Sequence, residues 1–582
     1  MSPEISSARV RVSQRTVPEL PDELHPNSLV HRLLAARGVT DPGELQFGLA
    51  DLPRPDLLPD IDAAVARLLA ARDSGERVLI VGDYDCDGAT STSVALQGLR
   101  MLGFEQLDFL IPGRFEFGYG LSPGIVDVAQ QEYRPGLILT VDNGVASVEG
   151  VERARHWGID VVVTDHHLAP QVLPTAIAIV NPNVPGSRFP AVNLAGVGVI
   201  FYTLLAVRAQ LRRQGDAHAT ADLAGLLDLV AIGTVADVVP LDRVNRTLVE
   251  QGLRRIRAGR TRVGVQALLK VAGKDSVGMS TQDIGFGIGP RLNAAGRLAD
   301  MSVGVRCLMT DSGREALALA TELNDFNQQR RAIEGDMKRE AEQQLLDHDL
   351  DDWQQSSAFS VCLFDEHWHE GVIGILAGRI KEKLHRPCVA FTADGDDRLK
   401  GSARSIKGVH VRDVLQSIAS RRPDMIEKFG GHAMAAGMTL RRDCFEAFCE
   451  LFEAEVRSVL AERLPEREFM VDGSLGSDER TLDNALLLGN LMPWGQEFEA
   501  PLFVDRFRVR RQQAVGKDQA HLKLLLESLD GGEVLDAIAF NCRLDTEVGD
   551  ILLAIYSLDV NVWRDRQQMQ LRVHHLEASG LS

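Results

Sequence analysis

The sequence predicts an α/β protein with a doubly wound parallel-sheet domain, a long connector helix, a second, smaller α/β domain and a C-terminal β-barrel. Three observations predict this fold class. Between residues 60 and 240, short apolar strands without polar alternation are separated by helical segments, which is typical of a parallel sheet covered on both faces. Residues 312–349 form a charged, proline-free stretch with Leu and Ala at helical spacing. From residue 466 onward, short strands are separated by Gly and Asp turns.

The composition limits the class of protein. The chain has 582 residues, too many for a single core, and a formal net charge of -19. No apolar run approaches the roughly 20 residues that span a bilayer, and the N-terminus has no apolar signal core, so we expect a soluble cytoplasmic protein. The negative charge argues against a protein that coats nucleic acid over its whole surface. Basic residues gather at 254–262, 328–331 and 506–511, where a local nucleic-acid groove and an ordinary solvated face are equally good interpretations.

The cysteines point to an intracellular protein without a thiolate metal site. There are seven, scattered along the chain with no C-x-x-C pair. This spacing disfavours both a disulfide framework and a structural zinc site. We therefore expect reduced thiols in the core.

The first domain is predicted from its regular alternation of elements. Strands are expected at 78–82, 107–111, 137–141 and 160–164, and helices at 61–75, 89–102, 122–134 and 147–157. The strands are rich in β-branched residues and are expected to be buried on both faces. Residues 222–258 are also expected to be helical.

The later parts follow from a change in pattern. The connector helix, at about 1.5 Å per residue, would span over about 50 Å. The second α/β domain is expected to have strands at 359–364, 387–392 and 399–405 and a helix at 371–385, and the strand-rich segment after it predicts an OB-fold, a common oligonucleotide-binding module. The predicted parts are an N-terminal segment 1–55, the sheet domain 56–310, the connector 311–350, a substrate-clamp domain 351–465 and a nucleic-acid-binding OB-fold 466–582.

The stretch VLIVGDYDCDGATSTSV places Asp83, Asp85 and Asp87 at every second position. Clustered carboxylates repel one another and indicate a bound cation, and the nearest short pattern is the EF-hand calcium loop. That loop requires Glu at its twelfth position, where this chain has Val94. An EF-hand loop also follows a helix, whereas residues 78–81 form an apolar β-branched run. The pattern therefore predicts a metal site at the end of a strand.

Further acids follow the other predicted strands. Asp142 follows the strand at 137–141, Asp165-His166-His167 follows the strand at 160–164, and Asp237 interrupts a later apolar run. Ligands bind at the carboxyl ends of parallel strands, so we expect these groups to converge. Alone, a strand-end Asp is an ordinary helix cap, adjacent histidines are often surface residues, and Asp237 could cap a turn. Together they need cations to neutralise them. Oxygen ligands with one or two imidazoles favour Mn²⁺ or Mg²⁺, and the number of ligands fits two metals that hydrolyse a phosphate ester.

The motifs DYDCDG, TVDNG, TDHH and GTVADVVPL, in this order, resemble the four metal motifs of the DHH phosphoesterase family. GPRLNAAGRL (289–298), HWHEGVIGILAGRI (367–380), GSARS (401–405) and FGGHAMAAGM (429–438) extend the resemblance to the bacterial single-strand-specific exonucleases of that family. PWGQEFEAPLF (493–503) resembles the entry to their OB-fold. The resemblance covers about residues 30 to 575.

The resemblance implies a role for each acidic residue and histidine. Asp85 would hold a first metal and Asp87 a second, with Asp142 between them. His166 and Asp237 would complete the shell of the second metal. Asp83 would be either a direct ligand or a group behind the ligands, Asp165 would orient the imidazoles, and His167 would face the scissile phosphate as a donor.

The resemblance also implies phosphate contacts. In the second domain, Ser402 and Arg404 would grip a terminal phosphate, and the backbone at Gly430-Gly431-His432 would approach it closely. Further contacts would come from the first domain, from Arg114, Arg291, Asn293 and Arg297.

The implied activity is 5′-to-3′ digestion of single-stranded DNA to 5′-mononucleotides, in DNA repair, mismatch repair and recombination. The implied partners are a single-strand-binding protein and a RecQ-type helicase, for a monomeric protein associated with the nucleoid. One alternative is a DHH nanoRNase or cyclic-dinucleotide phosphodiesterase, although such chains are usually shorter and lack a C-terminal barrel. The other is an inactive DHH scaffold that binds replisome proteins, against which the intact metal motifs argue.

Overall fold

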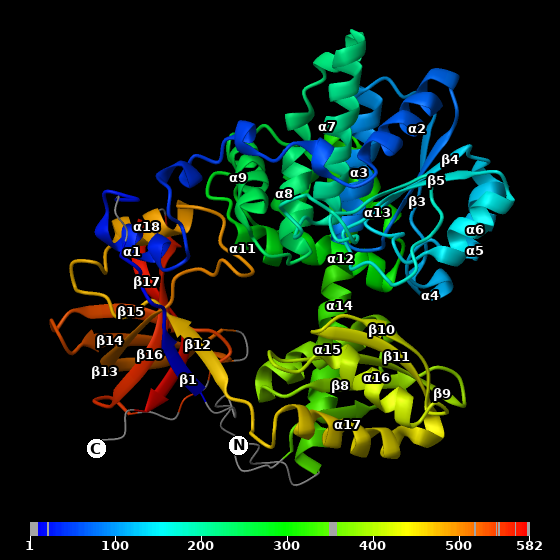
Figure 1. Ribbon diagram of the computed structural model, residues 1–582. Coiled ribbons are helices and arrows are strands. Elements are labelled where there is room, and N and C mark those ends of the chain that lie inside the picture. The colour runs from blue at the N-terminus through cyan, green and yellow to red at the C-terminus, as the bar shows by residue number, and fades with distance from the viewer. Residues whose placement is uncertain are drawn as a thin grey trace. The chain divides into compact units, whose positions relative to one another are not determined.

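The computed structural model describes residues 10–19, 23–347, 358–516, 519–542, 544, 547–564 and 566–578 (Figure 1). The chain divides into two compact units. One comprises Leu20–Gln328 and Leu487–Ala500, and the other comprises Met1–Glu19, Gln329–Leu486 and Pro501–Ser582. Within the described residues, no helix is both long and apolar enough to cross a membrane. The predicted fold class is confirmed, and the predicted residues 348–350 of the connector lie outside the described part.

The first unit is built on a five-stranded sheet in the order β3-β2-β4-β5-β6, with every neighbouring pair parallel. The strands are β2 (Val78–Gly82), β3 (Leu107–Leu110), β4 (Leu137–Val141), β5 (Asp160–Thr164) and β6 (Ala178–Val180). Strand order reverses at β2, because the chain runs from β2 outward to β3 and then returns to the other side of β2 for β4. Ligands of open parallel sheets bind at the carboxyl ends of the strands beside such a reversal.

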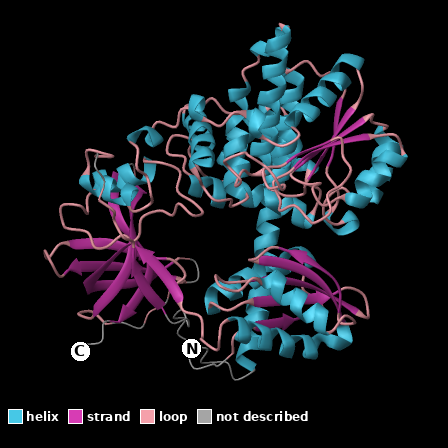
Figure 2. Cartoon of the chain, viewed as in Figure 1, coloured by secondary structure: helices cyan, strands magenta, loops and turns pink. Residues whose placement is uncertain are grey.

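Helices cover both faces of this sheet (Figure 2). On one face, apolar residues of β2, β4 and β5 form a core with α5 (Pro123–Val128), η4 (Ala129–Tyr133) and α6 (Val148–His156). On the other face, α3 (Cys86–Met101) contacts β2, β3 and β4, and α7 (Gly196–Gln214) contacts β4 and β5. This two-sided cover explains why the strands are apolar without alternation.

This unit contains further helices. They are α1 (Ser28–Ala35), α2 (Ile61–Ser74), α4 (Arg114–Phe117), α8 (Leu227–Ala236), α9 (Arg243–Arg257), α10 (Val263–Val271), α11 (Thr281–Asp283), η7 (Ile284–Ile288), α12 (Gly289–Leu298) and α13 (Ser302–Met309). Short 3-10 turns lie at η1 (Pro42–Leu45), η2 (Leu49–Asp51), η3 (Pro55–Leu57), η5 (Ala217–Thr220) and η6 (Leu223–Leu226).

Two helix predictions differ from the structure, one at its start and one by a break in its middle. The helix predicted at 89–102 begins already at Cys86, because the Asp85 side chain caps it by accepting from the backbone N–H of Gly88 at 2.9 Å. The helical stretch predicted at 222–258 is broken between α8 and α9. There Val238 has a left-handed backbone (φ 61°) and Pro240 follows, so the helix cannot continue. β6 was not predicted, since three residues carry too little pattern.

The connector helix α14 (Gly313–Asp347) leads into the second unit, whose α/β part has a five-stranded mixed sheet in the order β10-β11-β9-β8-β7. β7 and β8 are parallel and the other neighbours antiparallel. The elements are β7 (Val361–Phe364), α15 (Glu370–Leu384), β8 (Cys388–Ala393), β9 (Arg398–Arg404), α16 (Val411–Arg421), β10 (Ile426–Gly431), β11 (Ala435–Arg441), η9 (Arg442–Cys444) and α17 (Phe445–Val459). Helices α16 and α17 enclose the core with this sheet.

The C-terminal part is a closed barrel in the order β13-β14-β15-β17-β16. Its strands are β13 (Phe503–Val515), β14 (His521–Ser528), β15 (Val534–Ala539), β16 (Ile551–Trp563) and β17 (Arg566–Ala578), preceded by α18 (Leu482–Asn490). The strand-rich segment after residue 466 does not enter the barrel at once. Its first strand, β12 (Arg467–Val471), instead pairs in parallel with β1 (Val10–Gln14) from the other end of the chain.

Candidate metal centre

The loop after β2 places three carboxylates at the reversal point of the sheet. Asp83 directly follows the strand, Asp85 caps α3, and Asp87 lies in the first turn of that helix. Asp83 and Asp87 are 5% and 1% exposed. The alternating acids of the sequence motif thus mark a strand end that passes directly into a helix.

Asp142 follows β4, the neighbour of β2, and has a left-handed backbone with φ 62°. The Nδ2 of Asn143 donates to the carbonyls of Val81 and Val141 at 3.1 and 3.0 Å, which ties the ends of the two strands together. A Cβ on Gly196 would lie 2.6 Å from Asp142, so only glycine admits this approach of α7. A strained, tightly enclosed acid is a frequent feature of functional sites.

The N-terminus of α7 also contacts Asp87. The backbone N–H groups of Gly196 and Val197 donate to its two carboxylate oxygens at 2.7 and 3.1 Å. These bonds use N–H groups that have no partner within the helix, and the helix dipole favours the negative charge. The carboxylate of Asp87 is therefore fixed in orientation by a helix that lies more than a hundred residues away in the sequence.

Asp165 organises the segment after β5. Its carboxylate accepts from the backbone N–H of Val145, His166 and His167 at 2.8, 2.7 and 3.1 Å, and lies 2.8 Å from Nδ1 of His167. Although burial alone raises the pKa of this carboxyl, the hydrogen bond and charge of His167 lower it below its ordinary value. Burial alone lowers the pKa of His167, but the contact with Asp165 and the surrounding acids raise it to about 9.

His166 links the strand ends to α8. Its Nε2 lies 3.1 Å from Oδ1 of Asp142 and 3.4 Å from Oδ2 of Asp237, which follows the last turn of α8. The backbone carbonyl of His166 accepts from Nδ2 of Asn183 at 2.6 Å, which holds this segment in place. The structure thus brings Asp237 to the three strand ends.

The charges of this cluster are balanced only in part by the protein, through His167 and Arg114. Within the described residues, no Lys or Arg forms an ion pair with Asp83, Asp87, Asp142 or Asp237. Burial and the neighbouring carboxylates raise the pKa of the first three well above the ordinary value, and burial and Asp85 raise that of Asp237 to about 7. Carboxylates in this state take up either protons or cations.

Three overlapping groups of side chains have ligand atoms within 4.8 Å of one another. They are Asp83, Asp85 and Asp142; Asp87, His166 and Asp237; and Asp142, His166 and His167. Carboxylate oxygens with one or two imidazoles fit Mn²⁺ or Mg²⁺. The adjacent Cys86 does not alter this ligand set, because burial and the neighbouring acids raise the pKa of its thiol well above the usual value. The residues present therefore fit divalent cations.

The phosphate-binding residues predicted in this unit differ in their surroundings. The guanidinium of Arg114 lies over the ring of Tyr84, with 5.0 Å to the centroid. Arg297 lies near enough to Tyr84 to lower the pKa of its hydroxyl, which burial raises. Arg291 is buried and donates to the carbonyls of Gly287 and Val271 and to Asn324, and Oδ1 of Asn293 accepts from the N–H of Cys86 at 2.8 Å. Arg291 and Asn293 thus hold α12 and the loop after β2 in place.

The other predicted phosphate residues lie together in the second unit. Ser402 and Arg404 share one face of β9, and Nη1 of Arg404 lies 3.2 Å from Oγ of Ser402. Across the sheet, Ser402 is opposite Gly437, which is opposite Gly430. His432 follows β10 directly, and its N–H donates to the carbonyl of Ala435.

Sequence reasoning missed several residues that shape the metal centre. Tyr119 places its hydroxyl 3.0 Å from the ring of His167, and Asn181 and Asn183 donate to the carbonyls of His167 and His166. The signals were present but weak: a tyrosine between two glycines, and two asparagines that flank a proline after a three-residue strand. Gly196 carried no local signal, because its role depends on a contact between distant segments.

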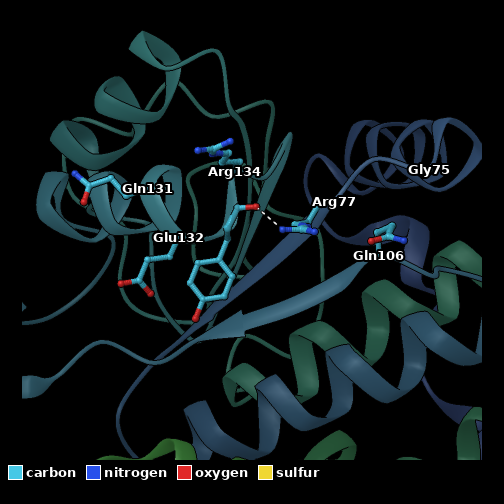
Figure 3. A pocket seen from close by; sticks show the side chains of 7 residues that line it. Gly75, Arg77, Gln106, Gln131, Glu132 and Arg134 are labelled. Carbon is cyan, nitrogen blue, oxygen red and sulfur yellow. Dashed lines mark hydrogen bonds between the residues drawn. The ribbon is translucent and has the colours of Figure 1, made fainter.

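A separate pocket of about 560 Å³ lies at the opposite edge of the sheet (Figure 3). Its lining includes Arg77, Gln106, Tyr133 and Arg134. Arg77 donates to the carbonyl of Tyr133 at 2.7 Å and lies 3.5 Å from Asp108. This pocket contains none of the clustered acids.

Comparison with known proteins identifies the family. Family models match residues 77–234 (DHH family, N-terminal domain), 355–458 (DHHA1 domain) and 471–575 (RecJ OB domain). A protein of Salmonella typhimurium described as single-stranded-DNA-specific exonuclease RecJ is 47% identical, over 95% of this chain and 96% of its own length. The chain belongs to the RecJ family. The RecJ of Escherichia coli is 46% identical, over 98% of this chain and 99% of its own length.

Solved RecJ structures share the fold. The crystal structure of RecJ from Thermus thermophilus in complex with Mn²⁺ matches with a TM-score of 0.79 at 28% identity, covering 98% of this chain and 80% of that one. A second RecJ structure of the same organism, in complex with Mg²⁺, matches with a TM-score of 0.74 at 27% identity, covering 98% of this chain and 79% of that one. The predicted membership in the DHH phosphoesterases is therefore confirmed.

Proposed function

We propose that the protein is a single-strand-specific 5′-to-3′ DNA exonuclease that releases 5′-mononucleotides by two-metal hydrolysis and acts in DNA repair and recombination. The observation that carries this proposal is the largely buried acid cluster at the reversal point of the sheet, whose acids have no Lys or Arg ion-pair partner among the described residues. The RecJ relatives, described as single-stranded-DNA-specific exonucleases, define the substrate class.

The metal-binding residues are assigned from their positions. Asp85 would hold one cation and Asp87 the other, and Asp142 would serve both, since it groups with Asp83 and Asp85 and lies 3.1 Å from His166. His166 and Asp237 belong to the same group as Asp87. Asp83 lies with Asp85 and Asp142 and serves as a ligand or directly behind one. When bound, two such cations lower the pKa of a water and stabilise the charge that develops on the phosphate oxygens.

The protein groups around these ligands orient them and supply donors. Asp165 fixes both neighbouring histidines through its backbone and side-chain hydrogen bonds. It also keeps His167 protonated near neutral pH, since the pKa of that imidazole is raised to about 9. A protonated His167 is a hydrogen-bond donor for an oxygen of the scissile phosphate.

The phosphate contacts are assigned to two groups. Arg114 and Arg297 serve the first unit, and Ser402, Arg404 and the backbone at Gly430-Gly431-His432 hold the 5′-terminal phosphate in the second. Arg291 and Asn293 belong to the first group as well, where the bonds of Arg291 to Asn324 and Gly287 and that of Asn293 Oδ1 to the N–H of Cys86 hold them in place. The segments 56–310, 351–465 and 466–582 then act as catalytic, substrate-clamp and strand-binding domains.

We also infer the cellular setting from the family. The protein would act as a monomer at the nucleoid, with a single-strand-binding protein that presents the strand and a RecQ-type helicase that supplies it. This inference is tested by measuring the rate of degradation of two single strands of equal length, one covered with single-strand-binding protein and one bare. Each is assayed with and without the helicase. Equal rates in all arms would contradict it.

The activity is tested with end-labelled DNA. Single-stranded and duplex DNA of the same sequence are digested with Mn²⁺ or Mg²⁺ after EDTA treatment. We expect mononucleotides from the 5′ end of the single strand only, and only with added metal. Digestion of blunt duplex at a similar rate, or activity without metal, would contradict the proposal.

The phosphate clamp is tested by Arg404→Ala. Loss of a charge-assisted contact should raise the Michaelis constant about tenfold for 5′-phosphorylated strands and leave strands with a 5′-hydroxyl unchanged. Lys400→Ala, on the same strand β9 where Lys400 lies 3.5 Å from Glu370, is the matched control. An equal change for both kinds of end would remove the clamp assignment.

Two alternative functions predict other outcomes. A nanoRNase or cyclic-dinucleotide phosphodiesterase would prefer a dinucleotide over a long single strand. An inactive scaffold would show no metal-dependent hydrolysis of any of these substrates. The C-terminal barrel and the intact acid cluster favour the exonuclease over both.

A further inference from the structure

Tyr119 is an aromatic residue beside the metal centre that the function proposed above does not yet use. It lies in the loop between α4 and α5, between Gly118 and Gly120, both of which have left-handed backbones with φ 74° and 80°. Glycine is the residue that adopts this conformation without strain. The two glycines therefore allow the loop to turn sharply on either side of the tyrosine and present it. The side chain is 49% exposed.

The hydroxyl of Tyr119 is fixed to the metal centre. It lies 3.0 Å from both ring nitrogens of His167 and donates to the backbone carbonyl of Asp142 at 3.3 Å. The rings of Tyr119 and His167 meet edge to face, with 5.4 Å between centroids. The polar end is thus anchored next to the acids, in a residue that is about half exposed.

A second tyrosine extends this aromatic surface. Tyr84 lies between Asp83 and Asp85, and its ring meets that of Tyr119 edge to face with 6.4 Å between centroids. The guanidinium of Arg114 covers the Tyr84 ring. Apolar ring surface therefore borders a cluster of carboxylates on two sides, where structural needs alone would favour polar or basic side chains.

We propose that Tyr119 is a substrate-contacting residue whose ring stacks on the base next to the scissile phosphate, with Tyr84 and Arg114 as the support of that surface. The inference rests on the proposed nuclease function and adds a residue that positions the nucleotide. A phosphate drawn to the metal ligands brings its nucleoside within reach of this ring. Stacking accepts any of the four bases because each has a π-face, as an exonuclease without sequence preference requires. An anchored ring loses little conformational freedom when the base binds.

The test is a double-mutant cycle in which the ring of Tyr119 and the base of the substrate are removed separately and together, and the Michaelis constant is measured. Wild type, Tyr119→Ala and Tyr119→Phe are assayed with Mn²⁺ on two single strands. One strand is unmodified, and in the other the two nucleotides that flank the first scissile phosphate are abasic. Tyr133→Ala is the matched control, since Tyr133 is a half-buried tyrosine of the same unit at the opposite edge of the sheet. The thermal melting temperature of each variant shows that it is folded.

We expect Tyr119→Ala to raise the Michaelis constant on the normal strand about tenfold, within the range that aromatic stacking gives to single-strand binding. On the abasic strand it should change less than about twofold, because the base is already missing. Tyr119→Phe keeps the ring and should stay within about threefold of wild type on both strands. Tyr133→Ala should match wild type.

Several outcomes would overturn the inference. The first is that Tyr119→Ala and wild type have equal Michaelis constants on the normal strand. The second is that Tyr119→Ala raises the Michaelis constant equally on both strands, which would mean that Tyr119 acts only through His167. If no variant cleaves the abasic strand, binding is measured instead. The dissociation constants of both strands are then compared between Asp142→Ala and the double variant Asp142→Ala, Tyr119→Ala, and the same outcomes apply. A wild-type chain that fails to degrade the normal strand contradicts the proposed nuclease instead.

Discussion

The carboxylates at the two edges of the five-stranded sheet differ in whether a basic side chain pairs with them. At the amino edge, Arg67 donates to both oxygens of Glu76 at 2.8 Å and to Asp160 at 2.6 Å, and Arg77 lies 3.5 Å from Asp108. At the carboxyl edge, the buried acids after β2 and β4 have no Lys or Arg as ion-pair partner among the described residues, and their pKa values are raised.

This difference separates structural charge from functional charge. Acids at the amino edge are paired and complete the fold. Acids at the carboxyl edge cost folding free energy unless protons or cations neutralise them. A fold keeps such a cluster only where a ligand provides the neutralising charge, so this contrast within one sheet points to the carboxyl edge as the active site.

The largest expected effect is that of removing Asp142. Asp142→Ala should lower the rate of Mn²⁺-dependent strand degradation by about 1,000-fold or more, because the shared ligand position is lost. Asp142→Asn should have a similar effect on the rate. Since asparagine tolerates the left-handed backbone and carries no charge, the melting temperature of this variant in EDTA should equal or exceed that of the wild type.

The matched change at the amino edge is Asp160→Asn. It removes a paired acid from the same sheet and should leave the rate of degradation within about twofold of wild type. Activity that survives Asp142→Ala, or that disappears in Asp160→Asn, would break the contrast between the two edges.

The second effect concerns metal and pH. In the metal-free chain the pKa of Asp237 is raised to about 7 by burial and Asp85, whereas an unfolded Asp titrates near about 4. Between these values the folded chain holds a proton that the unfolded chain has lost, so this group's contribution to stability is complete below about pH 4 and is lost as pH rises through about 7. Because a cation replaces the proton, the rise in melting temperature caused by Mn²⁺ should be larger at about pH 8 than at about pH 6.

Asp237→Asn tests the assignment of this effect. The variant has no proton to lose at this position and should show a smaller increase of the Mn²⁺ effect with pH. Arg67→Ala, at the other edge, should show the same increase as the wild type. A metal effect that does not depend on pH would contradict the uptake of protons by the cluster.

The smallest effect is expected at the amino edge. Arg67→Ala should lower the free energy of unfolding by about 1 to 2 kcal/mol, since it leaves two half-exposed acids without their donor. Activity per folded molecule should not change. Arg155→Ala, which breaks an exposed pair with Glu152, is the control and should cost less than about 0.5 kcal/mol. A loss for Arg67→Ala as small as that of the control would show that this pairing does not stabilise the fold.

Much of the sheet and the identity of its acids could be predicted from the sequence. The strands at 78–82, 137–141 and 160–164 occur as predicted, because buried parallel strands produce a local apolar signal. The residues that follow them lie at one edge of the sheet for the same reason. The clustering of Asp85, Asp142 and His166 is thus a consequence of strand polarity.

Other parts of the candidate site depend on contacts between distant segments. The donation from the start of α7 to Asp87, the anchoring of Tyr119 on His167 and the burial of Arg291 have no local pattern. The parallel pair β1 and β12 joins segments more than 450 residues apart. Such contacts are selected by packing and by the need to satisfy buried polar groups, and neither is visible in a short window of sequence.

The sequence by itself determined which acids follow which strands, and therefore the type of chemistry that this protein performs. This is because the apolar pattern that predicts a strand is local, and the same residues fix where that strand ends. Only the tertiary structure decided that Asp237 reaches those strand ends, that α7 orients Asp87, and that Arg291 is buried against backbone carbonyls. The physical reason is that a ligand set requires atoms within a few ångströms of one another, and that proximity is set by long-range packing.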